Sequence, residues 1–189
     1  YELRLKYGIP AKKRVFFCPA RLLKLKGLDL FLKSAGKVKG ISKACFLLAG
    51  EGPMKKELQD IADKENLDVH FMGYCNQDTV IEFYALSDFF FLPSLQDCNP
   101  LSAIEAAFAG LPLCVSIYTG NSPELIQPYK NGVVFDILDT EEVQACIYFL
   151  LNASEEWVSN AGRESLAIAQ NSFACINETK KFLAQLREG

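Results

Sequence analysis

The sequence has a single histidine, His70, and no pair of cysteines in a C-x-x-C arrangement. Its seven cysteines are scattered over positions 18, 45, 75, 98, 114, 146 and 175, and most lie inside apolar runs. A zinc cluster needs several closely spaced Cys or His ligands, so this distribution argues against one and we expect no metal. An odd, scattered set predicts buried free thiols in a reducing compartment, which favours a cytoplasmic protein.

Long apolar runs and an excess of basic residues are also absent. No run approaches the roughly 18 apolar residues that a transmembrane helix requires, and Tyr1-Glu2-Leu3-Arg4 is not the start of a signal peptide. The 20 Lys and Arg residues are outnumbered by 23 Asp and Glu, a formal net charge of -3, which argues against a nucleic-acid partner. The first residue is not methionine, so we expect an excised piece of a longer protein.

The 189 residues suit one domain, and half of them are hydrophobic, enough for a substantial core. Six short, nearly continuous apolar runs predict strands buried on both faces, as in a parallel sheet covered by helices. They alternate with helical patterns, which predicts an α/β fold with a doubly wound, Rossmann-like parallel sheet of about six strands. The predicted strands are Val15–Ala20, Ala44–Ala49, Val69–Met72, Phe89–Leu92, Leu113–Val115 and Val133–Phe135. The predicted helices between them are Leu28–Val38, Pro53–Glu65, Gln77–Leu86, Leu101–Ala109 and Ser122–Ile126.

The last third of the chain changes character. Glu141–Asn152, Glu155–Asn171 and Phe173–Arg187 read as three consecutive helices without strands between them. We treat residues 1–189 as one domain, in which the helices from about 140 to 187 either cover the sheet or reach towards another domain.

Ligands of such sheets bind beyond the carboxyl ends of the strands, so the loops there carry the candidate site. Arg21 and Lys26 flank the turn after the first strand, where a phosphate would meet an arginine fork and a lysine charge. Solvated loop charges are the alternative interpretation. Gly50-Glu51-Gly52-Pro53 follows the second strand and is half of a dinucleotide-binding glycine pattern, or simply a tight turn with Pro53 starting a helix.

The segment after the fourth strand is the most informative. Asn99 is a suitable helix N-cap and Pro100 a suitable first helical residue, which leaves the amides of Leu101 and Ser102 as a natural phosphate site. Glu105 shares their helix face and has apolar neighbours, so we expect it to be partly buried and to need a partner. That partner is either a ligand with vicinal hydroxyls or a structural Arg or Lys.

Taken together, these loops resemble the C-terminal, donor-binding domain of retaining glycosyltransferases with the GT-B fold, in glycosyltransferase family 4 (glycosyl transferases group 1). The similarity runs in order from about residue 10 to 185, and its specificity lies in the ordered set of motifs. The matching pieces are Ala20-Arg21-Leu22, Lys26-Gly27, Gly50–Pro53, Phe71-Met72-Gly73-Tyr74, Pro93-Ser94, the acid pair Asp97 and Glu105, Glu105–Pro112, Pro123-Glu124 and Asn131-Gly132.

The resemblance implies a role for each matching residue. Arg21 and Lys26 would bind the donor diphosphate, Asp97 would contact the transferred sugar and Glu105 would hold the ribose hydroxyls; these four are the implied catalytic residues. The rest of the implied donor site consists of Gly50, Gly73, Tyr74 and Cys75, with the last three beside the base, together with Asn99, Leu101 and Ser102.

The resemblance also implies the partners. The donor would be a UDP-, GDP- or ADP-linked sugar, used without a cofactor or a metal, and the acceptor would be a glycan or a lipid-linked acceptor. The other half of the enzyme would be an N-terminal acceptor domain that this chain lacks, through which the full-length protein would contact the inner face of a membrane.

Three departures from the family pattern concern the donor. Asp97 is one methylene shorter than the usual Glu, Asn99-Pro100 replaces Phe-Gly, and Thr119-Gly120 replaces Gly-Gly. Two other functions stay open: half of a nucleotide-sugar epimerase, and a non-catalytic nucleotide-binding module. An epimerase needs acid–base residues, whereas His70 lies mid-strand at what we expect to be a core position; the retained Arg21, Lys26 and Glu105 argue against lost catalysis.

Overall fold

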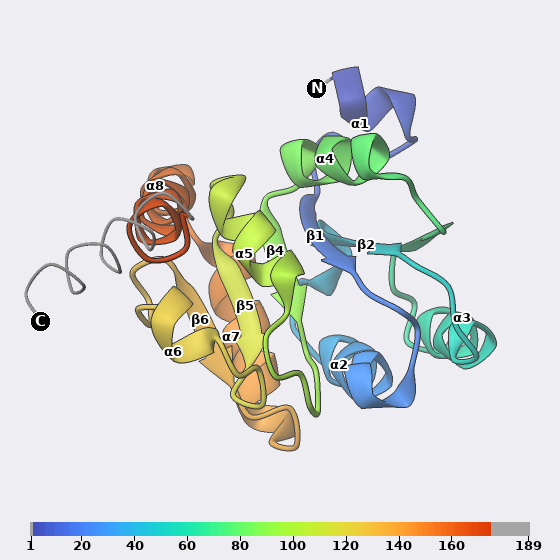
Figure 1. Cartoon of the computed structure of the whole chain (residues 1–189). Coiled ribbons are helices and arrows are strands. Elements are labelled where there is room, and N and C mark those ends of the chain that lie inside the picture. Colours follow the sequence, from blue (N-terminus) through green and yellow to red (C-terminus); the bar gives the residue numbers. More distant parts are fainter. Residues whose placement is uncertain (1, 175–189) are drawn as a thin grey trace, which may run out of the picture.

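The computed structural model describes residues 2–174, which form a sheet between two layers of helices (Figure 1). The strands are β1 (Arg14–Pro19), β2 (Ala44–Ala49), β3 (Val69–Gly73), β4 (Phe89–Leu92), β5 (Leu113–Ser116) and β6 (Gly132–Phe135). The α-helices are α1 (Glu2–Lys6), α2 (Leu28–Ala35), α3 (Lys55–Lys64), α4 (Gln77–Leu86), α5 (Leu101–Phe108), α6 (Ser122–Leu125), α7 (Thr140–Asn152) and α8 (Glu155–Ser172). Short 3₁₀ turns precede α2 (Lys24–Lys26) and β2 (Ile41–Lys43).

All six strands pair in parallel, in the order β3-β2-β1-β4-β5-β6. This confirms the predicted doubly wound, Rossmann-like sheet, and each predicted strand agrees with the observed one to within a residue at either end. The order reverses between β1 and β4. Parallel sheets of this kind leave a crevice at the carboxyl ends of the two strands that flank the reversal, which makes that edge the place to look for a ligand.

The helices divide between the two faces of the sheet. On one face α2 packs against α3 and α7, and on the other α4 packs on β1, and α5 on β4, β5 and α8. Of the two described helices after β6, α7 packs on β6 and α2, whereas α8 packs on α5 and α6. The third predicted C-terminal helix, Phe173–Arg187, falls almost wholly outside the described residues. No helix among residues 2–174 is both long and apolar enough to cross a membrane.

Phenylalanine rings fill the core between the sheet and α2. Phe31 of α2 stacks on Phe91 of β4 at 4.7 Å between ring centroids and meets Phe46 of β2 edge-on at 5.9 Å. Phe16 of β1 lies among the same rings, whereas its neighbour Phe17 points to the opposite face and packs on α4. Both faces of β1 are therefore buried, as its continuous apolar run predicted.

Two local predictions were wrong. The helix expected to begin at Pro53 begins at Lys55, because Gly52, Pro53 and Met54 form a turn that the Lys55 amide closes on the Gly52 carbonyl at 3.2 Å. His70 is half-buried rather than a core residue, because β3 lies at the edge of the sheet, and its Nε2 lies 3.0 Å from Asp68 Oδ1. Helix α1 was not anticipated.

The loops at the carboxyl edge approach one another closely. Gly27, at the start of α2, has a left-handed φ of 64°, and a Cβ atom there would lie 2.1 Å from the Pro93 carbonyl oxygen. Only glycine fits such a contact, because any side chain collides with backbone that cannot rotate away. The Lys26-Gly27 match thus has a structural cause: it lets the loop after β1 lie against the end of β4.

This contact predicts a difference between two glycines with the same backbone conformation. Gly8 has a φ of 66°, but a Cβ atom there would meet nothing within 4 Å. We expect Gly8→Ala to lower the free energy of unfolding by about 1–2 kcal/mol, the cost of the left-handed conformation. Gly27→Ala should lower it by about 1–3 kcal/mol more, because of the clash. Urea unfolding of both variants measures the difference, and equal losses would contradict the assigned contact.

Candidate functional site

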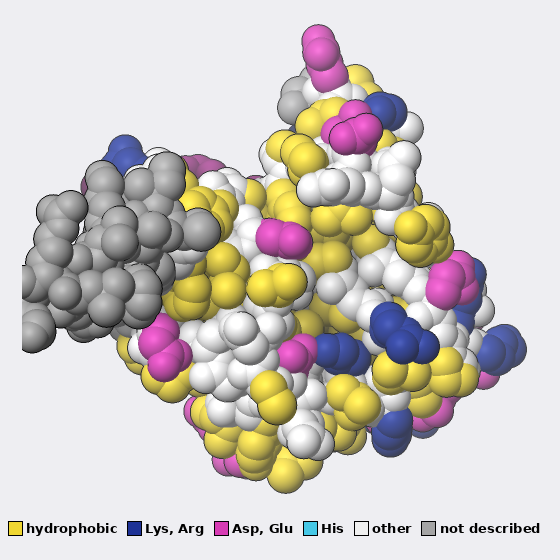
Figure 2. Space-filling view, viewed as in Figure 1, with side chains coloured by type: hydrophobic (Ala, Val, Ile, Leu, Met, Phe, Trp, Pro, Cys, Tyr) yellow, Lys and Arg dark blue, Asp and Glu magenta, His cyan; other side chains and the backbone are white. Residues whose placement is uncertain are grey.

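Two adjoining hollows lie at the carboxyl edge of the sheet, where the strand order reverses. One, a cavity of about 840 Å³, opens between α4 and α5 and is lined by Pro19, Cys75, Gln77, Val80, Ile81, Tyr84, Ala85, Ser102, Glu105, Phe108 and Ala109. The other, of about 580 Å³, lies above the ends of β1 and β2 and is lined by Pro19, Ala20, Arg21, Ala49, Gly50, Glu51, Gly52, Tyr74, Cys75 and Val80. Figure 2 shows a hollow below α4 with mostly hydrophobic walls, and Lys or Arg side chains gathered on its lower side.

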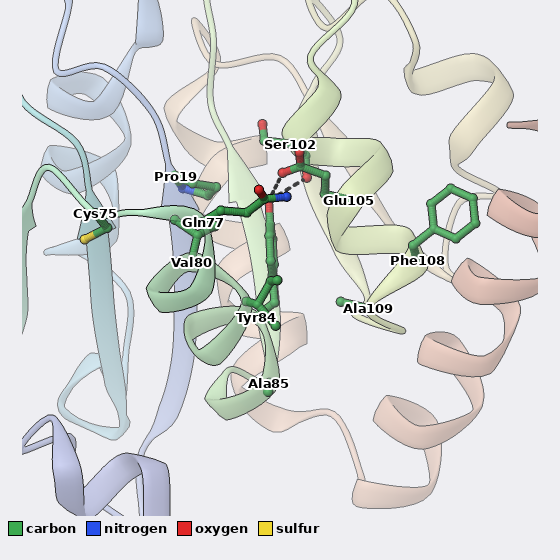
Figure 3. Close-up of a pocket in the computed structure, with 11 residues that line it drawn as sticks. Pro19, Cys75, Gln77, Val80, Tyr84, Ala85, Ser102, Glu105, Phe108 and Ala109 are labelled. Carbon is green, nitrogen blue, oxygen red and sulfur yellow. Dashed lines mark hydrogen bonds between the residues drawn. The ribbon is translucent and has the colours of Figure 1, made fainter. Parts of the chain in front are cut away.

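Glu105 projects from α5 into the cavity between α4 and α5 (Figure 3). Its Oε2 accepts a hydrogen bond from the hydroxyl group of Tyr84 at 3.0 Å, and the same hydroxyl lies 3.1 Å from the Ser102 carbonyl oxygen. The expectation that Glu105 is partly buried was wrong, since its side chain faces the open cavity and counts as exposed. Within residues 2–174 no Arg or Lys pairs with Glu105. The alternative that a structural Arg or Lys is its partner is therefore wrong for this part of the chain.

Helix α5 begins at Leu101 with no side-chain cap, which corrects the prediction that Asn99 caps it. Asn99 instead accepts a hydrogen bond through Oδ1 from Asn121 Nδ2 at 3.0 Å, and Asn121 also donates to the Pro100 carbonyl oxygen at 3.1 Å. The Asn99 side-chain oxygen is therefore bonded to the loop after β5 and does not cap the helix. The first amides of an α-helix have no intrahelical acceptor, so those of Leu101 and Ser102 are available to an anion.

The loops after β4 and β5 also hold buried side-chain oxygens that lack a partner among the described residues. They are Ser94 Oγ, Thr119 Oγ1 and Asn121 Oδ1, and each of these residues is at most 5% exposed. Unpaired buried oxygens are costly and rare in folded proteins. These three oxygens make the edge next to the start of α5 polar.

The structure pairs two of the residues that the sequence assigns to the site. Lys26 Nζ, from the loop after β1, lies 2.5 Å from Asp97 Oδ2, from the loop after β4, and both side chains are more than four-fifths buried. Neither is among the residues that line the two hollows. Arg21 does line the second hollow, is exposed, and has no acidic partner within the described part of the chain.

The remaining candidates gather around the second hollow. Gly50 and Gly73 bridge the ends of β2 and β3, and Gly50 lines the hollow together with Tyr74 and Cys75. The Tyr74 side chain is 85% exposed, which leaves its ring free to contact a ligand. The structure thus brings Gly50, Gly73, Tyr74, Cys75 and Arg21 to one place, and Ser102 and Glu105 to the adjoining one.

The thiols follow the predicted pattern only in part. Cys18, Cys45, Cys114 and Cys146 are buried, as expected, but Cys75 is half-buried and Cys98 is exposed. Both exceptions lie in loops at the carboxyl edge, where the chain leaves the core. Cys175 lies outside the described residues.

Among residues 2–174, one group of potential metal ligands lies close together. Ligand atoms of Cys45, Asp68 and His70 are within 4.8 Å of one another, and none of the three lines either hollow. Asp68 is already engaged, with Oδ2 2.9 Å from Lys13 Nζ and Oδ1 near His70. Burial raises the pKa of the Cys45 thiol to about 12, with Asp68 adding to the shift. Asp68 thus already has a lysine and a histidine ring as partners, and the group lies apart from both hollows.

Sequence reasoning missed Tyr84 and Gln77, both from α4. Gln77 reaches from the first turn of that helix towards Glu105 (Figure 3). A signal for Tyr84 was present: a buried phenol on the apolar face of a helix requires a hydrogen-bond partner. The partner itself comes from α5, so no local pattern identifies it.

The model of the family described as glycosyl transferases group 1 matches residues 2–164. N-acetyl-alpha-D-glucosaminyl L-malate synthase of Bacillus anthracis is 26% identical over 164 residues, which cover 87% of this chain and 42% of that protein. A sulfoquinovosyl transferase of Arabidopsis thaliana is 30% identical over 168 residues, 86% of this chain and 32% of that protein. The chain spans about a third to two fifths of the length of these relatives.

Solved structures share this fold. HepE of Anabaena, solved in complex with UDP and glucose, aligns with a TM-score of 0.82 at 19% identity, over 100% of this chain and 52% of that one. Sucrose-phosphate synthase of Thermosynechococcus elongatus aligns with a TM-score of 0.81 at 20% identity, over 99% of this chain and 49% of that one. The doubly wound sheet is therefore that of GT-B glycosyltransferases.

The burial of the thiols predicts how they react with Ellman's reagent in a Cys175→Ser background. Cys98 should react first because it is exposed, Cys75 more slowly, and the four buried thiols only after denaturation. Cys98→Ser should remove the fastest phase and leave the others unchanged. A fast phase that survives Cys98→Ser and Cys75→Ser together would show that a core thiol is accessible.

Proposed function

The chain belongs to the glycosyl transferases group 1 family, and from that premise we propose that it binds the nucleotide-sugar donor of a glycosyltransferase where β1 and β4 diverge. The donor is a UDP-, GDP- or ADP-linked sugar, transferred with retention of configuration to a glycan or lipid-linked acceptor. The acceptor is held by a second, N-terminal domain that this chain does not contain, so we expect the chain alone to bind the donor and to transfer no sugar.

The observation that carries this proposal is the environment of Glu105. Its carboxylate faces a cavity and is held by a neutral phenol, with no cation beside it within residues 2–174. A carboxylate placed in this way can accept hydrogen bonds from two neighbouring hydroxyls, as a ribose offers. A structural role would instead have called for a cationic partner.

The second part of the proposal concerns the diphosphate. Arg21 lies exposed at the second hollow, and Lys26 and the first amides of α5 flank the same sheet edge. When the bond from the sugar to phosphate breaks, negative charge grows on the departing diphosphate. Fixed cations and helix amides stabilise that charge in the transition state, so these residues supply the chemistry without a metal or cofactor. Asp97 faces the transferred sugar, with Asn99 beside it.

Gly50, Gly73, Tyr74 and Cys75 complete the proposed site on the side of the nucleobase. Gly50, Tyr74 and Cys75 line the second hollow, Gly73 is bridged to Gly50, and this hollow adjoins the cavity into which Glu105 projects. The complex of HepE with UDP and glucose, which shares this fold, supports a nucleotide as the ligand. His70 lines neither hollow, which weighs against the epimerase alternative, since no histidine stands ready to move a proton there.

Because Glu105 is proposed to bind the ribose and Arg21 and Lys26 the diphosphate, their variants should differ in which ligand they bind more weakly. Glu105→Gln should weaken the binding of a nucleoside and of its diphosphate alike, by about 10- to 150-fold, since one charge-assisted acceptor is lost. Arg21→Ala and Lys26→Ala should weaken only the diphosphate. Calorimetry with uridine, guanosine, adenosine and their diphosphates measures all three effects.

Lys56→Ala is the matched control, because it removes a cation that pairs with Asp60 on α3, away from both hollows. It should change neither affinity. If Glu105→Gln lowers only the melting temperature and the cation variants bind normally, the site assignment is wrong and only the fold remains.

The ion pair predicts that Asp97 competes with the diphosphate for Lys26. Asp97→Asn should therefore raise the affinity for the nucleoside diphosphate by about fivefold, the equivalent of about 1 kcal/mol for a partly buried pair. Sugar transfer by the complete enzyme should fall, because the carboxylate that faces the sugar is gone. Reduced diphosphate affinity in Asp97→Asn would show instead that Asp97 orients Lys26 for binding.

A further inference from the structure

Tyr84 connects α4 to α5, the two helices that line the first hollow. It lies in the last turns of α4, is 5% exposed, and packs edge-on against Phe17 of β1 at 5.0 Å between ring centroids. From there its hydroxyl group reaches across to α5, where it meets the Ser102 carbonyl oxygen and the Glu105 carboxylate (Figure 3). The ring is fixed by the core, and only the hydroxyl faces the cavity.

The hydroxyl has one proton and two acceptors, at 3.1 Å and 3.0 Å. Burial raises the pKa of Tyr84 well above its ordinary value, and the neighbouring Glu105 charge adds to the shift, so the phenol stays a donor at every working pH. Its proton is shared between Oε2 of Glu105, the shorter contact, and the Ser102 carbonyl oxygen. The other carboxylate oxygen, Oε1, has no partner within the described part of the chain and is left for a ligand.

An exposed glutamate on a helix normally samples several rotamers, and a ligand that binds it must fix one of them. Here a rigid donor selects the rotamer before any ligand arrives. Among the described residues, Tyr84 is the one hydrogen-bond partner of the Glu105 side chain. The carboxylate is thus aimed by a residue that the family motifs quoted above do not include.

We propose that Tyr84 is a positioning residue: its hydroxyl holds the Glu105 carboxylate in the orientation that receives the ribose hydroxyls of the donor. This inference rests on the proposed function of the site. Tyr84 acts through Glu105 and not on the ligand itself. Because the same hydroxyl also touches Ser102 in the first turn of α5, it fixes the carboxylate relative to the amides that face the diphosphate.

A purely structural role makes a different prediction. If the hydroxyl served only to fasten α4 to α5, its loss would lower the melting temperature and would affect a ligand equally whether or not Glu105 were present. The two roles are separated by a double-mutant cycle, in which coupling between Tyr84 and Glu105 is read from ligand affinity rather than from stability.

The test compares Tyr84→Phe, Glu105→Ala and the double variant with the wild-type protein, using calorimetry with uridine, guanosine, adenosine and their diphosphates. Tyr84→Phe keeps the ring and its packing, so it should fold and melt within a few degrees of the wild type. It should weaken nucleoside and diphosphate binding by the same factor, about tenfold, as expected for loss of one hydrogen bond to a charged group. The double variant should bind no more weakly than Glu105→Ala alone.

Tyr7→Phe is the matched control. The Tyr7 hydroxyl also donates to a glutamate of α4, Glu82, at 2.6 Å, but neither residue lines the hollows. Its loss should leave every affinity unchanged.

The outcomes separate this inference from the function on which it rests. If the wild type binds none of the nucleotides, both fail. If it binds and Glu105→Ala weakens binding while Tyr84→Phe does not, only the role of Tyr84 is wrong. An equal loss on removing the hydroxyl from the wild type and from Glu105→Ala would also overturn it, because the hydroxyl would then act independently of the carboxylate.

Discussion

The reversal of strand order between β1 and β4 determines where the loops that carry the candidate residues lie. On one side of that point the crossover helices run over the face of α2 and α3, and on the other they run over the face of α4 and α5. The loops that leave β1 and β4 therefore turn in opposite directions and cannot cover the ends of their own strands. The functional candidates lie around the space this leaves: Arg21 and Lys26 follow β1, Asp97 and Glu105 follow β4, and Tyr84 lies on α4, which leads from β3 to β4.

That geometry explains why the fold could be read from the sequence and part of the site could not. Burial on both faces leaves a local record, the unbroken apolar run, so strands such as Phe89–Leu92 were located to the residue. Whether a strand is central or at the edge of the sheet leaves no such local pattern in the sequence. His70 was taken for a core residue because its run resembles the others, and only the strand order shows that β3 is an edge. Hydrogen bonds between distant side chains also leave no local record. Asn99 is a suitable helix cap by its sequence, but its Oδ1 accepts a hydrogen bond from Asn121 of another loop.

The candidate residues were predicted from the sequence, on the chemical groups expected at strand ends and on the resemblance to a family pattern. Their mutual arrangement was not. The sequence predicts that Glu105 is partly buried and needs a partner. In the structure its carboxylate is exposed, and its partner is the buried phenol of Tyr84 from α4. It also brings Lys26 and Asp97, assigned separately to phosphate and sugar, into one ion pair. Tertiary contacts between different βα units decided each of these outcomes.

The pair of Lys26 and Asp97 has a consequence for the turnover of the proposed site. In the proposed site, a ligand whose phosphates bind Lys26 separates this lysine from Asp97. The hydroxyls of the donor sugar would then give Asp97 new hydrogen-bond partners. The spent nucleotide, having given up its sugar, has nothing to offer that carboxylate. Re-formation of the pair then works against the product but not against the donor. In the proposed site, the pair of Lys26 and Asp97 would thus favour the exchange of a used nucleotide for a new donor.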